Sequence, residues 1–119
     1  MPMLISDSCK AIQRTDSLGG LPLKIEEAQE MMRRIYLERD RARGVAGTVQ
    51  RTFDELEELK AALDTNEVAI AIADEVADVF AWLCSLANLL EIDISDAFYK
   101  KYSNVCSKCK KSPCECPES

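Results

Sequence analysis

The sequence predicts an all-α protein, and three observations support that prediction. Apolar residues recur at helical spacing in several segments, no segment alternates polar and apolar residues as a strand does, and turn or capping residues separate the periodic segments. We expect one helical domain at residues 21–104, between an irregular segment at 1–20 that contains Cys9 and a cysteine-rich tail at 105–119.

The first predicted helix follows Gly19-Gly20 and carries Pro22 near its start, where proline is tolerated. It ends near Gly44, because glycine commonly follows the last helical turn. A short loop at 44–48 then leads to a second helix from about residue 49 to residue 63.

The third predicted helix runs from about Glu67 to Leu90, with Thr65 or Asn66 as its cap. Its heptads are apolar nearly all round, which is typical of a helix covered on several sides. Cys84 lies in this helix and is expected to be a small buried apolar residue.

The fourth predicted helix lies near residues 94–103 and is introduced by Asp93 or Ser95. The helical region as a whole is small, so its core is limited. We therefore expect a helical bundle that is completed by homo-oligomerisation, as a homodimer or homotetramer.

Charge and composition exclude several functions. The net charge of −6 argues against a nucleic-acid polymer as partner. No secretory signal is evident, and acidic residues interrupt the apolar run at 68–90, so we expect no membrane span and a cytoplasmic location. The chain has no histidine, which removes Ser-His and Cys-His nucleophiles and leaves carboxylates, lysine, tyrosine and cysteine for chemistry.

Four acidic residues are predicted to converge. Glu75 and Asp78 are three residues apart in the apolar third helix and share a face, whereas Asp74 points away. Glu55 and Glu58 share a face of the second helix, beside its leucine stripe. A short connection favours antiparallel packing of these two helices, which brings both pairs together.

Several carboxylates at close range cannot all stay ionised without a counter-charge. A hard divalent cation resolves the conflict, and oxygen ligands suit Mg²⁺ or Mn²⁺ completed by substrate phosphates. Two other interpretations stay open. Glu55 and Glu58 could form an ordinary solvated face, and Glu75 and Asp78 could form ion pairs with basic residues of the neighbouring helices (Lys60, Arg51 or Arg34).

The pattern E-x-x-E at Glu55 and Glu58, a 16-residue spacer and E-x-x-D at Glu75 and Asp78 resembles the MazG-type nucleoside triphosphate pyrophosphohydrolases. The surrounding segments DELEELKAAL and ADEVADVFAWLCSLANLLEIDISDA strengthen the resemblance, which covers roughly residues 23–104. It implies magnesium-dependent hydrolysis of a (deoxy)nucleoside triphosphate to monophosphate and pyrophosphate. By matching positions, the four carboxylates would hold the metal, and family members commonly form dimers or larger oligomers.

The resemblance also implies substrate contacts from a lysine and an asparagine four residues apart, which Lys100 and Asn104 match. Ser107 stands about where the family frequently has an arginine, so one phosphate contact is missing. Trp82 shares the acidic face, either as core residue or as a stacking surface for a base. Arginines near the end of the first helix either bind phosphate or form a solvated helix end: Arg39, Arg41 and Arg43.

The tail sequence CSKCKKSPCEC spaces Cys106, Cys109, Cys114 and Cys116 as C-x₂-C-x₄-C-x-C. Close cysteines in a chain without secretory features favour a metal over disulfides, and a structural Zn²⁺ is the default ion. A reduced or disulfide-bonded tail is the alternative. For the whole chain, the alternative to an enzyme is a non-catalytic helical interaction module that carries a structural zinc tail.

Overall fold

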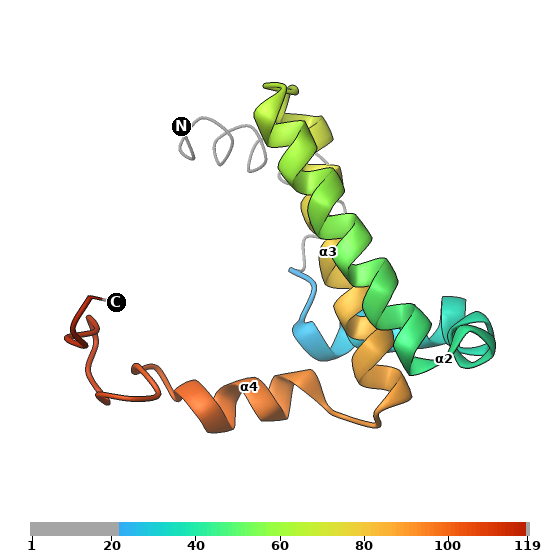
Figure 1. Cartoon of the computed structure of the whole chain (residues 1–119). Coiled ribbons are helices and arrows are strands. Elements are labelled where there is room, and N and C mark those ends of the chain that lie inside the picture. The colour runs from blue at the N-terminus through green and yellow to red at the C-terminus, as the bar shows by residue number, and fades with distance from the viewer. Residues whose placement is uncertain (1–21, 119) are drawn as a thin grey trace.

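The computed structural model describes residues 22–118, which contain three helices and no strand (Figure 1). These are α2 at Ile25–Asp64, α3 at Ala69–Leu89 and α4 at Ile94–Tyr102. The all-α prediction is confirmed for this part of the chain. The predicted irregular segment at 1–20, with Cys9, lies outside the described residues.

Helix α2 joins the first two predicted helices across a sharp kink at Gly44, the residue with φ 85° and ψ 171°. The predicted loop at 44–48 is wrong, because the chain is helical again directly after the kink. Thr48 explains the tight restart: its Oγ1 donates a hydrogen bond to the Gly44 carbonyl oxygen at 2.8 Å. The kink turns the chain so that the two halves of α2 run in different directions (Figure 1).

The connection from α2 to α3 is a tight turn, and the two helices lie side by side and antiparallel (Figure 1). Thr65 closes α2, its N–H bonded to the Ala61 carbonyl at 3.0 Å, and Asn66 adopts a left-handed φ of 56°. The prediction that Thr65 or Asn66 caps the next helix is therefore wrong. Val68 occupies the N-cap position and α3 begins at Ala69.

Helix α4 begins as predicted, because the Asp93 side chain accepts a hydrogen bond from the Asp96 N–H at 3.0 Å. The turn before it is tied to α2 by Gln29, whose side chain bonds the Asn88 side chain at 3.0 Å and the Ile92 carbonyl at 2.7 Å. Beyond this anchor α4 points away from the α2–α3 pair and carries the tail at its far end (Figure 1). It ends at Tyr102, one residue short of the predicted limit.

The buried apolar core of the described chain is small. It consists of Ala62, Ile72, Cys84 and Ala87, so the expected burial of Cys84 is confirmed. Large apolar side chains remain exposed on all three helices, among them Ile35, Phe53, Leu56, Ile70, Val76, Phe80, Leu83, Phe98 and Tyr99. Helix pair α2–α3 therefore buries only one side of each helix.

Within residues 22–118, no helix combines the length and the apolar character that crossing a membrane requires.

Candidate functional site

Three of the four predicted carboxylates converge between α2 and α3. Glu55 from α2 and Glu75 and Asp78 from α3 each place a carboxylate oxygen within 4.8 Å of the other two. Glu55 is buried, Glu75 is half-buried and Asp78 is exposed, so the cluster opens to solvent on one side. Glu58, one turn further along α2, is exposed and lies at the edge of the cluster.

Burial and crowding change the acidity of this cluster. The pKa of Glu55 is raised above its ordinary value, first by loss of solvation and then by the charges of Glu58, Asp78 and Glu75, while Arg51 opposes the shift. The pKa of Glu75 is raised by the same loss of solvation and by its acidic neighbours. Full ionisation of Glu55 and Glu75 is therefore unfavourable in the folded chain unless a cation binds beside them.

Two buried oxygen atoms in the cluster have no hydrogen-bond partner, Glu55 Oε1 and Glu75 Oε1. Buried polar atoms are normally paired, so each orphan requires an explanation. A hard divalent cation bound by carboxylate oxygens supplies it, since such an ion accepts several oxygen ligands and retains water in its other positions. The donor set thus fits Mg²⁺ or Mn²⁺.

The ion-pair interpretation of the cluster has little support in the described chain. Lys60 pairs with Asp64 at 2.8 Å, and Arg34 pairs with Glu30 at 3.2 Å. Arg51 reaches only Glu55 among the three clustered acids, at 3.8 Å. Within residues 22–118, Glu75 and Asp78 form no ion pair, so their charges are balanced neither by the proposed basic residues nor by others.

A pocket of about 330 Å³ lies beside the carboxylates and shares Asp78 with them. Both halves of α2 contribute to it, because the kink brings the first half back toward the second half and α3. Its walls combine three arginines with two aromatic rings and a few smaller groups: Met32, Tyr36, Arg39, Asp40, Arg43, Arg51, Asp78, Ala81, Trp82 and Ser85. A basic, aromatic pocket next to a cluster of carboxylates suits a ligand that has both a phosphate chain and a flat ring.

Trp82 lies in the pocket wall and is half-buried. The guanidinium of Arg43 lies 4.5 Å from its ring centroid and that of Arg51 lies 5.2 Å away. Both distances are within the range of cation–π attraction. The indole therefore holds two positive charges at the edge of the acidic cluster.

Asp40 is a pocket residue that the sequence did not reveal. It is 1% exposed, its Oδ1 accepts a hydrogen bond from Arg43 at 2.8 Å, and its Oδ2 has no partner. In the sequence it stands among arginines in RDRARG, a pattern typical of a solvated helix end. The sequence feature that could have indicated this position is Gly44. A kink at Gly44, in place of the predicted loop, turns the end of the first half of α2 toward the pocket.

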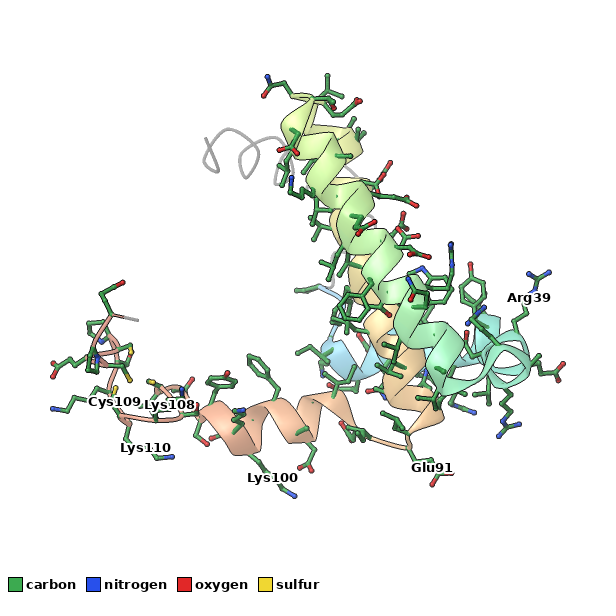
Figure 2. The ribbon with its side chains drawn as sticks, in the orientation of Figure 1. Arg39, Glu91, Lys100, Lys108, Cys109 and Lys110 are labelled. Atoms are coloured by element: carbon green, nitrogen blue, oxygen red, sulfur yellow. The ribbon has the colours of Figure 1, made fainter. Side chains whose placement is uncertain are left out.

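Two predicted substrate-binding residues lie away from this pocket in a single chain. Lys100 is exposed on α4 and pairs with Asp96 at 3.0 Å, and Asn104 is exposed beyond the end of that helix. Figure 2 shows Lys100 on the far arm of the molecule, separate from Arg39 beside the pocket. Arg39 lines the pocket with an otherwise exposed side chain.

A second cluster lies in the tail, where the sulfurs of Cys106, Cys109, Cys114 and Cys116 all lie within 4.8 Å of one another. None of these four thiols is in a disulfide. This cluster is at the opposite end of α4 from the carboxylates, as the labelled Cys109 shows (Figure 2).

Comparison with protein families identifies a match to the MazG nucleotide pyrophosphohydrolase domain over residues 43–110. The match spans the second half of α2, all of α3 and α4, and the first two cysteines of the tail. It therefore contains every residue of the carboxylate cluster, whereas Tyr36, Arg39 and Asp40 precede it. No curated protein sequence matches the chain significantly. Because the family match covers more than half of the chain and includes the converging acids, the protein belongs to the MazG nucleotide pyrophosphohydrolase domain family.

Proposed function

We propose that this protein hydrolyses (deoxy)nucleoside triphosphates to monophosphate and pyrophosphate in a reaction that depends on magnesium. The observation that carries the proposal is the pair of orphaned, buried oxygens of Glu55 and Glu75 beside an arginine-lined pocket. Membership of the MazG family supports the same reaction class.

The cation would be held by Glu55, Glu75 and Asp78, with Glu58 at the open edge of the cluster. When bound there, Mg²⁺ or Mn²⁺ would supply positive charge that neutralises and orients the phosphates and lowers the pKa of a bound water. The open side of the cluster leaves room for phosphate oxygens to complete the coordination, which is the usual arrangement for magnesium.

The pocket arginines would bind the triphosphate. Arg43 and Arg51 are fixed over the Trp82 ring, and Arg39 stands at the exposed rim, so a phosphate chain entering the pocket meets positive charge on one side and the metal-binding acids on the other. Trp82 and Tyr36 offer aromatic surface for the base. The Oδ2 atom of Asp40 has no hydrogen-bond partner, so it would accept a hydrogen bond from a donor group of the nucleoside.

The proton acceptor would be a glutamate of the cluster. A water attacks the α-phosphorus, pyrophosphate departs, and a carboxylate takes the proton that the water loses. The chain offers no histidine for this role.

We further propose that the active form is a homodimer or homotetramer. The exposed apolar faces of α2, α3 and α4 support assembly with a second copy, because one chain buries so few apolar residues. Lys100 and Asn104 are remote from the pocket of their own chain, so a role for them in substrate binding requires that α4 reaches the pocket of a neighbouring copy.

The decisive experiment measures pyrophosphate release over a panel of ribo- and deoxyribonucleoside triphosphates, with magnesium and with chelator. The Asp78→Ala variant should lose turnover and keep its helical circular dichroism, and Glu57→Gln on the exposed face of α2 is the matched control. Release of orthophosphate instead would reject attack at the α-phosphorus. No release from the folded protein would favour the non-catalytic interaction module.

A further inference from the structure

The tail that follows α4 gathers four thiols at nearly equal separations. The sulfur–sulfur distances are 3.6 Å between Cys114 and Cys106, 3.7 Å between Cys106 and Cys116, and 3.9 Å between Cys109 and Cys114. All four sulfurs lie within 4.8 Å of one another, so they surround a common centre.

These separations match tetrahedral zinc. With a Zn–S bond of about 2.3 Å, the edge of a regular tetrahedron of sulfurs is about 3.8 Å. A disulfide would bring two sulfurs to about 2.05 Å and leave the other pair apart from them. Four thiolates also form a soft donor set, which selects zinc over the hard cations that suit the carboxylate cluster.

The backbone of the tail is folded around the sulfurs. The Cys106 N–H bonds the Lys111 carbonyl at 3.0 Å and the Lys110 N–H bonds the Cys106 carbonyl at 2.9 Å, which closes the loop between them. Three backbone amides point at sulfur: Lys108 to Cys106 at 3.4 Å, Glu115 to Cys109 at 3.3 Å, and Cys116 to Cys114 at 3.3 Å. Such donors stabilise the charge of coordinated thiolates.

The tail has no packed core that would hold it in this shape. None of residues 103–118 is buried, and the tail extends from the far end of α4, away from the α2–α3 pair (Figure 1). Ordering such a segment costs conformational entropy that its few contacts do not offset. Metal coordination is the usual source of folding free energy for a segment of this kind.

We propose that Cys106, Cys109, Cys114 and Cys116 bind one zinc ion in a closed, structural site that holds the tail folded at the end of α4. Binding replaces the thiol protons and gives a Zn(Cys)₄ centre of net charge −2. Exposed lysines of the same loop offset that charge: Lys108, Lys110 and Lys111. The site has no free coordination position for a substrate, and it is separate from the carboxylate cluster.

The test uses the full chain, purified under reducing conditions and dialysed, with zinc measured by mass spectrometry. We expect one zinc per chain. Replacing zinc with Co²⁺ should give the thiolate-to-cobalt charge-transfer and visible bands of tetrahedral sulfur coordination, and added Zn²⁺ should abolish them. The double variant Cys114→Ser, Cys116→Ser should lose the metal and the cobalt bands yet keep the helical signal of α2 and α3.

Two variants serve as controls. Cys84→Ala removes a fully buried thiol of α3 and should keep one zinc per chain. Glu75→Gln alters the carboxylate cluster and should also retain one zinc per chain. Zinc content is thus measured independently of any hydrolytic activity. A metal-free wild type without cobalt bands would overturn the proposal, and so would disulfide-linked tail cysteines or bound iron in place of zinc.

Discussion

At the scale of single residues, the carboxylates of the α2–α3 interface are placed where ionisation is costly. Glu55 is 6% exposed, and Glu55 and Glu75 each have a buried oxygen without a hydrogen-bond partner in this crowded acidic cluster. A charge in such surroundings lowers the stability of the metal-free chain, because neither solvent nor a close ion pair compensates it. The arrangement resembles other binding sites in which stability is sacrificed for affinity toward a ligand.

This cost predicts an unusual pH dependence for the chelated protein. Glu55 and Glu75 have folded-state pKa values above the ordinary 4.5, so between that pH and the raised pKa values the folded state binds more protons than the unfolded state. The contribution of these groups to stability is therefore fully present below pH 4.5 and is lost as the pH rises through their folded pKa values. The neighbours that act on them are the acids Glu58, Asp78 and Asp74, with Arg51 opposing at Glu55.

Urea denaturation with chelator present, repeated across this pH range, measures the effect. Glu75→Gln should show a smaller decline with pH than the wild type and a higher stability at neutral pH, because it removes one unfavourable charge. It should also show less stabilisation by added Mg²⁺. Glu57→Gln, on the exposed face of α2, should behave like the wild type. The prediction would be contradicted if, with chelator present, the wild type gained stability relative to Glu75→Gln as the pH rises.

Helical spacing predicted that Glu55, Glu75 and Asp78 lie close together, but it did not predict that Asp40 reaches the pocket. The three acids lie on regular helices, where a period of 3.6 residues fixes which side chains share a face. Asp40 reaches the pocket only because α2 bends at Gly44, and a bend changes directions that a helical wheel assumes constant. Pairing of Asp40 with Arg43 likewise depends on that local geometry.

At the scale of the elements, the kink in α2 forms the pocket. The sequence predicted a break near Gly44 but placed a loop after it, since GVAGT combines two glycines with a threonine. In the structure the break is confined to Gly44, because Thr48 bonds its carbonyl and Arg43 lies within 3.4 Å of the Thr48 hydroxyl. The length of a break in a helix depends on such side-chain contacts, and the helix propensities of the individual residues do not predict them.

Gly44→Ala should test the importance of the kink. The backbone at φ 85° and ψ 171° is open almost only to glycine, so alanine should reduce the free energy of unfolding by about 1–3 kcal/mol. A Cβ at this position meets no atom within 4 Å, so the loss comes from backbone strain and not from a clash. If the pocket binds the triphosphate as proposed, the substitution should also raise KM, because it misaligns the two halves of the pocket.

Gly47→Ala is the matched comparison for the kink. Its Cβ would meet the Arg43 Cγ at 2.7 Å, so Arg43, which is bonded to the buried Asp40, must shift. We expect a loss of stability that comes from this displacement and not from backbone strain, together with a change in the fluorescence of Trp82, the sole tryptophan, as Arg43 leaves its ring. Wild-type stability in Gly44→Ala, measured by chemical denaturation, would show that the kink does not require glycine.

At the scale of the whole molecule, the helical hairpin is incomplete as a folded unit. The apolar character of α3 predicts a helix that is covered on several sides, but Val76, Phe80 and Leu83 remain exposed in one chain. The spacing of apolar residues shows that a face can be buried, but it does not show what covers that face. The number of copies and their arrangement therefore do not follow from the sequence. The exposed apolar area favours a second copy as that partner, and the proposed role of Lys100 in substrate binding requires one.

Val76→Glu tests this assembly directly. Val76 is 52% exposed in the single chain, and in an oligomer that buries the outer face of α3 a glutamate there would carry an unpaired charge into an apolar interface. We expect light scattering coupled to size-exclusion chromatography to show a dimer or tetramer for the wild type and a shift toward monomer for the variant. Ala61→Glu adds the same charge at an exposed position of α2 and should retain the wild-type mass. If the wild type is monomeric at every concentration, the apolar face serves another purpose and Lys100 cannot reach a neighbouring pocket.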